Sequence, residues 1–334
     1  MLAATWLLGA CSPDDGPGNG SLSAVETGFL GGEQLQVFPD APSEVGLYPD
    51  TTNRDDWTPS VSLFEPAHAL WTNGSEKQRF VSLPVGATVD TSQADWVFPV
   101  GVIFFKTFSY RALDEDSLPI ETRALRKTAE GWEYAVYLWD DEGADAALLD
   151  GSIPVKVAVS HQGDQFEHEV PSTLQCRMCH ESQEPRVIGF DELRLNAPLS
   201  GDTATQLAEL AEAGILSELP PAPDEIVHED ELTESVLGYF QGNCVHCHNG
   251  SFGAASAFDL DHSVALENII GVETTSELVG GIRVTPGLPD ESGLFLAVSR
   301  NSEVTTAQPM PPIGVQRVDE VAVDMIRRWI LALP

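Results

Sequence analysis

The stretch Cys244-Val245-His246-Cys247-His248 decides how the C-terminal part of this 334-residue chain is interpreted. It has the pattern C-x-x-C-H, which is the attachment signature of c-type haem. Two thiols on one helical turn can each bond a vinyl group of the same porphyrin. The His that follows then lies beneath the ring, where it ligates the iron. The pattern predicts a haem bound covalently by Cys244 and Cys247, with His248 as an iron ligand.

The same pattern occurs once more, at Cys176-Arg177-Met178-Cys179-His180, and the two motifs use every cysteine except Cys11. We therefore expect two covalently bound c-type haems, the first on Cys176 and Cys179 with His180 as iron ligand. Three alternatives compete. A thioredoxin-like pair would need a βαβ context that neither motif has. Structural zinc or two short-loop disulfides give no reason for a His directly after both pairs.

The flanks of the second motif predict a mainly helical region. Thr233 to Gly242 has apolar residues on one face and leads directly into the motif. Downstream is the Pro-rich loop Pro309-Met310-Pro311-Pro312, in which Met310 lies 62 positions after His248. Val318 to Leu333 has apolar residues at helical spacing and predicts a closing helix.

This order of helix, motif, Met loop and closing helix resembles a class I cytochrome c domain over residues 229–334. The resemblance implies that Met310 is the distal ligand of the second haem iron and that the two terminal helices cross. It also implies a close helix approach at Gly238, with Trp329 packed nearby. Met325 is the rival ligand, but its place on the apolar stripe of a helix favours a core role.

The second ligand of the first haem iron stays open. No Met and no Lys lies between His180 and Cys244. The candidates, by residue, are His228, His161, His168 and His68. The first haem is then either bis-His, with a low potential, or five-coordinate with an open site.

Residues 34–170 predict a different architecture, an antiparallel β-domain that is sandwich-like and without clear helices. The predicted strands are rich in β-branched and aromatic residues. They are Arg79–Leu83, the run Phe98–Tyr110, Glu121–Lys127, Trp132–Trp139 and Val155–Val159. The predicted fold class is therefore α+β, with the β-domain followed by a mainly α-helical cytochrome c region.

A first haem segment, residues 171–228, separates the β-rich region from the C-terminal one. Thr203 to Ala213 predicts a helix in it, and Gly214 predicts that helix's stop. The prolines Pro220, Pro221 and Pro223 then indicate a linker.

The N-terminus predicts export. The apolar stretch Leu2–Ala10, followed by Cys11 and a polar tail, resembles a bacterial lipoprotein signal over residues 1–11, without the usual basic n-region. It implies lipidation of Cys11, with residues 12–33 as a flexible tether. The expected location is the periplasm or outer membrane, with a lipid anchor as the link to the membrane, because no apolar run is long enough to span a bilayer.

Charge limits the partners. Seventeen Lys and Arg against 52 Asp and Glu give a net charge of −35, while 42% of residues are hydrophobic. The apolar content suffices for real cores. The negative charge argues against nucleic acid and against an anionic membrane surface. It suits a basic redox partner protein, or solubility alone.

Most of the chain, from about residue 60 to the C-terminus, resembles a family of bacterial dihaem c-type cytochromes of poorly known role. The stretches that match are Ala69–Phe80, Phe98–Tyr110, Glu121–Arg123, Gly131–Trp139, Gln175–His180, Cys244–Asn249 and the Met310 loop. The resemblance implies two haems and an exported location. It also suggests a parallel β-helix protein as a partner.

The expected function is electron transfer between redox partners by an exported dihaem c-type cytochrome. One alternative is an enzyme of the dihaem peroxidase or oxidase type, in which the first haem has an open iron. The other is a binding module, in which the β-domain recognises a partner and the haems are accessory. No phosphate-binding Gly loop, H-E-x-x-H or G-x-S-x-G motif is present.

Overall fold

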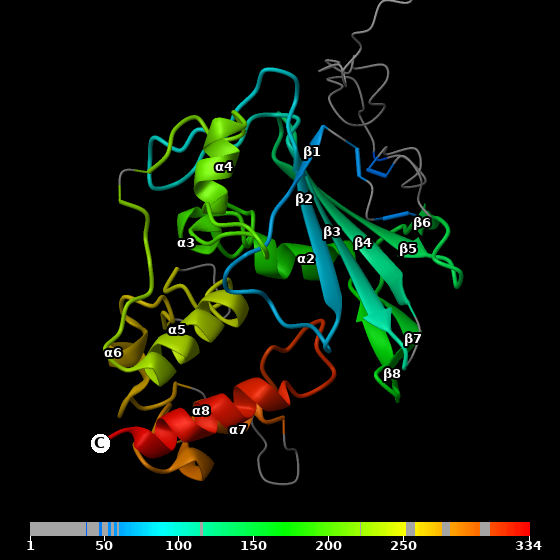
Figure 1. Ribbon diagram of the computed structural model, residues 1–334. Coiled ribbons are helices and arrows are strands. Elements are labelled where there is room, and N and C mark those ends of the chain that lie inside the picture. Colours follow the sequence, from blue (N-terminus) through cyan, green and yellow to red (C-terminus); the bar gives the residue numbers. More distant parts are fainter. Residues whose placement is uncertain are drawn as a thin grey trace, which may run out of the picture.

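The computed structural model of the protein describes residues 38, 47–48, 53–54, 57–58, 60–113, 116–220, 222–251, 258–275, 281–300 and 308–334. Its β-rich part is one six-stranded antiparallel sheet in which neighbouring strands follow chain order (Figure 1). The strands are β1 (Val61–Leu63), β2 (Glu76–Ser82), β3 (Ile103–Arg111), β4 (Ser117–Lys127), β5 (Trp132–Trp139) and β6 (Ala146–Leu148). A separate hairpin, β7 (Val155–His161) and β8 (Asp164–Val170), packs beside the end of β3.

Both faces of the six-stranded sheet are buried, because apolar residues alternate toward each face along its strands. One face includes Val81, Phe104 and Leu125, which pair across β2, β3 and β4. This face packs on residues 187–216. The opposite face, which includes Phe80 and Phe105, packs on residues 47 and 48.

Helices follow the hairpin and lie on one side of the sheet and beyond its end (Figure 1). In chain order they are α2 (Thr173–His180), α3 (Glu192–Leu195), α4 (Gln206–Glu212), α5 (Glu231–Asn243), α6 (Ala265–Ile269), the 3₁₀ helix η1 (Pro289–Glu291), α7 (Gly293–Val298) and α8 (Glu320–Ala332).

The predicted α+β class is confirmed: an antiparallel sheet region precedes the helices. The expected sandwich differs in one respect. Among the described residues, the second β-layer is only the β7–β8 hairpin, and the segment that contains α3 and α4 covers one sheet face instead. This segment supplies Phe190, Leu195 and Leu207, all fully buried, so a second large sheet is not needed to cover that face.

The C-terminal helices form their own core. α5 packs on α8 through the edge-to-face rings of Phe240 and Trp329, 6.4 Å apart between centroids. The indole Nε1–H of Trp329 also donates to Thr233 Oγ1 at 3.1 Å. Gly238 does allow a close approach, but to a different neighbour than expected. A Cβ at Gly238 would lie 2.7 Å from His68 Nδ1. The close neighbour of Gly238 is therefore the segment before β2, and not α8.

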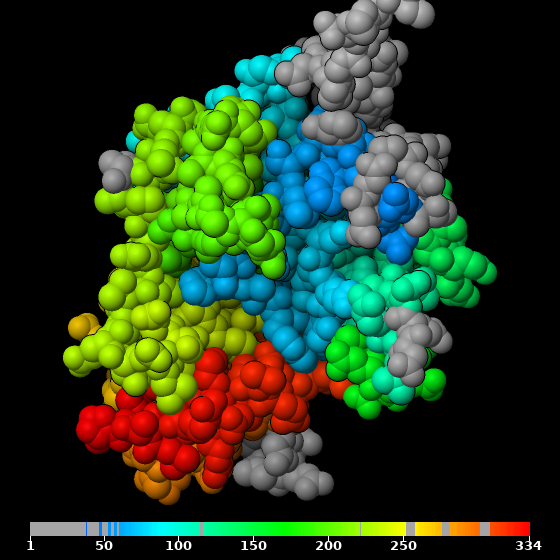
Figure 2. All heavy atoms as spheres, in the orientation of Figure 1, coloured from blue at the N-terminus to red at the C-terminus, as the bar shows by residue number. Residues whose placement is uncertain are grey.

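That segment joins the β-rich and C-terminal parts of the chain. Asn73 is fully buried, donates to Gln316 Oε1 at 2.7 Å, and accepts from the backbone N–H groups of Gln316 and Arg317. Trp71 N–H donates to Asn243 Oδ1 at 2.8 Å. In Figure 2 the red C-terminal segment therefore lies directly against the blue segment before β2. No helix in the described ranges is long and apolar enough to span a bilayer.

Candidate functional site

The first motif lies on α2, which begins with a capping box. Ser172 Oγ accepts from Gln175 N–H at 3.3 Å, and Gln175 Oε1 accepts from Ser172 N–H at 2.9 Å. These bonds satisfy two backbone donors that a short helix would otherwise leave unpaired. α2 places Cys176 against the sheet, where the thiol is buried with Val136 and Val170.

His180, the last residue of α2, has one ring nitrogen bonded to the backbone and the other available. Its Nδ1 lies 2.7 Å from the backbone oxygen of Arg186. A carbonyl only accepts, so Nδ1 holds the proton and Nε2 keeps a free lone pair. The ring packs on Tyr134 with 5.6 Å between centroids. Burial lowers the pKa of His180 to about 4, which keeps the imidazole neutral, as a metal ligand requires.

The second motif follows α5 without a break. The N–H groups of Cys247 and His248 both donate to Cys244 O, at 3.0 and 2.9 Å, so the pentapeptide forms a tight turn. The His248 ring packs on Phe258 with 4.5 Å between centroids. Burial, then the charges of His246 and Arg283, lower the pKa of His248 to about 4.

The two motifs, 68 positions apart in the sequence, meet in space. Ligand atoms of Cys179, His246 and Cys247 all lie within 4.8 Å of one another. Ser182, just after the first motif, donates to the backbone oxygen of His246, and its own carbonyl accepts from Asn249 at 2.9 Å.

All four motif thiols are free, so neither motif is closed by a disulfide. Hydrogen bonding to Cys247, and then burial, raise the pKa of Cys179 to about 12, while the same bond lowers the pKa of Cys247. Burial raises the pKa of Cys176 to about 11 and that of Cys244 to about 12. Two thiol pairs, each followed by a neutral imidazole, can bind two porphyrins covalently and ligate their irons. The cluster of Cys179, His246 and Cys247 can alternatively hold one soft metal ion.

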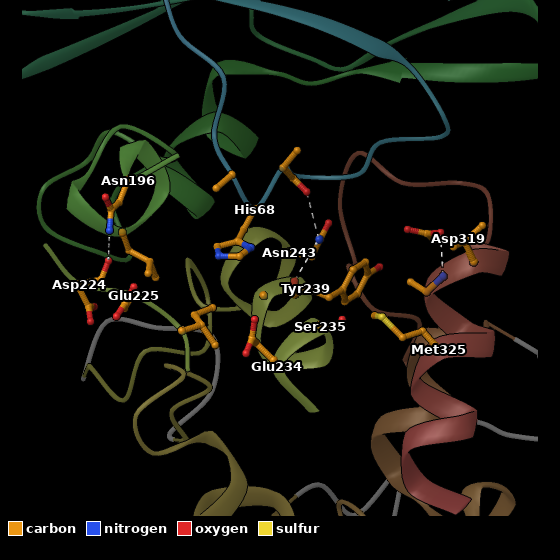
Figure 3. Close-up of a pocket in the computed structure, with 17 residues that line it drawn as sticks. His68, Asn196, Asp224, Glu225, Glu234, Ser235, Tyr239, Asn243, Asp319 and Met325 are labelled. Atoms are coloured by element: carbon orange, nitrogen blue, oxygen red, sulfur yellow. Dashed lines mark hydrogen bonds between the residues drawn. The ribbon is translucent and has the colours of Figure 1, made fainter. Parts of the chain in front are cut away.

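Met310 lies in a loop that other residues hold in place. Its N–H donates to Ala297 O at 3.0 Å, and its side chain is half-buried. Arg300 fixes the loop by donating to Pro311 O at 2.8 Å and to Val315 O at 2.7 Å. The rival, Met325, lies on α8, where it contacts the C-terminal core and lines a cleft (Figure 3).

The four histidines considered for the first iron occupy separate places. His168 is fully buried, and both its ring nitrogens are engaged, Nδ1 with Tyr110 Oη at 2.9 Å and Nε2 with Glu121 Oε1 at 2.8 Å. His161 packs on Tyr110. His228 accepts from Asp230 N–H just before α5.

His68 points from the segment before β2 toward α5 and lines the cleft of Figure 3 with Gly238 and Tyr239. Burial lowers its pKa, and Arg194 lowers it further. No described contact joins any of these four histidines to His180, so the structure does not single one out as the distal ligand.

Sequence reasoning overlooked His246, which it treated as a filler of the second motif. His246 is 6% exposed, and its Nδ1 is buried without a hydrogen-bond partner in the described part of the chain. A second histidine between the two cysteines was the available signal, but its approach to Cys179 depends on the tertiary fold.

Cys11 and the rest of residues 1–33 lie outside the described residues, so the predicted signal and tether have no structural account. No protein-family model, curated protein or solved structure matches this chain.

Proposed function

We propose that the protein is an exported dihaem c-type cytochrome that transfers electrons between redox partners. The contact between the two C-x-x-C-H motifs is the observation that supports this most strongly. Two cofactors bound there would be held close together by the chain itself. Closeness is what electron transfer between them needs, whereas two unrelated structural sites would have no reason to meet.

Each residue has a role in this proposal. Cys176 and Cys179 would bind the first haem, and His180 would ligate its iron through Nε2, the nitrogen left free by the bond to Arg186 O. Cys244, Cys247 and His248 would do the same for the second haem. Met310, on a loop fixed by Arg300, is the proposed distal ligand there. Bound haem iron supplies one-electron transfer.

The proposal includes membership of the dihaem cytochrome family named above, with a class I cytochrome c fold over residues 229–334. It also includes attachment of the chain to a periplasmic or outer-membrane surface through Cys11. A basic redox partner suits the net charge of −35, and a β-helix protein is the further partner suggested by the family.

The test is the number of haems per polypeptide, measured by pyridine haemochrome on protein made with a haem-attachment system. We expect two haems in the wild type. Cys176→Ala/Cys179→Ala and Cys244→Ala/Cys247→Ala should each retain one. The oxidised spectrum with and without cyanide then separates two functions. Two haems that resist cyanide support an electron relay, and one that binds it at once supports the peroxidase-type enzyme.

A metal centre is the second candidate, favoured by the donor set of Cys179, His246 and Cys247 and by the unpartnered Nδ1 of His246. Metal analysis of the same preparations tests it. Haem-free protein with one zinc per chain, lost in His246→Ala, would replace the cytochrome proposal with a structural metal site.

A further inference from the structure

A row of positive charges crosses the sheet face that the first motif covers. In the register of β2, β3 and β4, Arg79 lies opposite Lys106, and Lys106 lies opposite Arg123. Lys77, two residues before Arg79, belongs to the same face. Like charges directly opposite each other destabilise a sheet. Four of the chain's seventeen Lys and Arg are nevertheless gathered here.

The row beside these basic residues on the same face is apolar and belongs to the core. The next row on the same face is Val81–Phe104–Leu125, which packs into the core. Because side chains alternate along a strand, both rows face the same side of the sheet. The cation row is therefore turned toward the interior of the molecule, and Arg79 is only 6% exposed.

Among the residues that the structure describes, Glu65 and Glu121 are the carboxylates whose charges act on this row of four basic side chains. Glu121 is fully buried and pairs with Arg123 through two hydrogen bonds of 2.9 and 2.6 Å. Among the described residues, neither Lys106 nor Arg79 forms an ion pair, and the hydrogen bond of Lys77 goes to Ser75 O at 3.1 Å. Lys77, Lys106 and Arg123 also lie over the Phe108 ring, 5.6, 4.9 and 4.2 Å from its centroid, which is a weaker partner than a carboxylate.

Burial, and then its cationic neighbours, put the pKa of Lys106 well below its usual range and lower that of Lys77 to about 7. A buried amine or guanidinium keeps its charge when an anion pairs with it, and a lysine without such a partner loses its proton instead. An anion beside this row would therefore restore the charge of Lys77 and Lys106.

The row lies next to the first motif. The charge of Arg123 acts on the thiols of Cys176 and Cys179. The charge of Lys106 acts on the imidazole of His180. On the same sheet face, Val136 follows Arg123 in register and packs on Cys176.

We propose that Arg79, Lys106 and Arg123, with Lys77, form a carboxylate-binding site that receives the propionate groups of the first haem. The inference rests on the proposed function. A haem bound at Cys176 and Cys179 would carry two carboxylates, and Arg123 of the row lies close enough to act on the charge of both thiols. Charge-assisted hydrogen bonds from Lys and Arg would then replace the water that these carboxylates lose on burial. A free carboxylate or phosphate from solution has the same chemistry and is the competing source.

The test compares the two-haem wild type with Lys106→Gln, Lys106→Arg and Arg79→Gln. Lys156→Gln is the matched control, because Lys156 is an exposed cation on β7 that pairs with the exposed Glu167. The measurements are haem count, the propionate bending bands in resonance Raman spectra, and the reduction potential of the first haem. Wild type is also titrated with inorganic phosphate at constant ionic strength.

We expect Lys106→Gln and Arg79→Gln to shift the propionate bands and lower the first haem's potential, because loss of a positive charge favours the oxidised iron. Lys106→Arg should keep the wild-type bands, and Lys156→Gln should change neither quantity. Phosphate should have no saturable effect.

Two other results would overturn this assignment and leave the proposed function standing. One is unchanged propionate bands in both Gln variants of a two-haem protein, and the other is a saturable response of the wild type to phosphate. The second result would identify a site for free anions. If the wild type carried no haem on Cys176, both the proposed function and this assignment would be wrong. A haem count below two per chain identifies that case.

Discussion

At the scale of single residues, Glu121 is a fully buried carboxylate that bonds both Arg123 and His168. Burial alone would raise its pKa, but Arg123 and His168 hold it down at about 2, against an ordinary 4.5. Glu121→Gln removes the charge and leaves Arg123 without its partner. Loss of one member of a buried pair costs about 3 kcal/mol. We expect a loss of that size in the free energy of unfolding at pH 7, measured by urea denaturation.

The sign of the pH dependence follows from the lowered pKa. The stabilisation from the Glu121 carboxylate is complete above about pH 4.5 and is lost as the pH falls toward 2. The difference in free energy of unfolding between wild type and Glu121→Gln should therefore become smaller as the pH falls from about 4.5 toward 2. Glu167→Gln is the control, because Glu167 forms an exposed ion pair with Lys156. Such a pair changes the free energy of unfolding by no more than about 0.5 kcal/mol. A difference that stays constant with pH would show that Glu121 stabilises the fold without its charge.

The C-x-x-C-H motifs could be predicted from the sequence, but the residues that contact them in the fold could not. The spacing of Cys176, Cys179 and His180 is local, so it could be identified without a structure. The bond from His180 to Arg186 O and the approach of His246 to Cys179 depend on how distant segments pack. Haem attachment and Met310 ligation themselves remain predictions.

At the scale of elements, prediction succeeded where β-forming or helix-forming residues are dense. The predicted strand Trp132–Trp139 coincides with β5, and the predicted helix Thr233–Gly242 lies within α5. β8 was missed because Asp164–Val170 is largely polar and partly exposed. Its pairing with β7 depends instead on the two-residue turn at Gln162 and Gly163. Both residues have positive φ, as a type I′ hairpin turn requires.

The capping box of α2 gives a prediction about an element. Ser172→Ala removes the side-chain acceptor for Gln175 N–H, and loss of an N-cap costs about 1 kcal/mol. We expect a loss of that size in the free energy of unfolding and faster amide exchange across Thr173–His180, measured by hydrogen exchange.

Ser152→Ala is the matched control, because Ser152 bonds only the exposed Asp150 in a turn. It should stay within about 0.5 kcal/mol of wild type. Equal exchange rates across α2 in wild type and Ser172→Ala would show that packing on the sheet, not the cap, holds the first motif.

At the scale of the whole molecule, segments that the sequence suggested to be separate domains contribute side chains to the same hydrophobic core. Residues 187–216, assigned to the first haem segment, complete the core on one face of the sheet. Asn73, from the β-rich region, binds the loop before α8. The sequence indicated where composition changes along the chain. It did not indicate which segments pack together, because burial against a distant segment leaves no local pattern.

This sharing of cores predicts how fragments behave. A fragment of residues 34–170 would expose Val81, Phe104 and Leu125, which Phe190 and Leu207 cover in the full chain. Exposed apolar patches of this kind promote association. We expect this fragment to aggregate or bind the dye ANS strongly, whereas residues 34–220 should be monomeric and unfold cooperatively in urea. In the longer fragment, Leu207→Asp should restore dye binding, and the exposed change Glu212→Gln should not. A 34–170 fragment that stays monomeric, unfolds cooperatively and captures a specific protein would instead favour an independent binding module, with the haems as accessories.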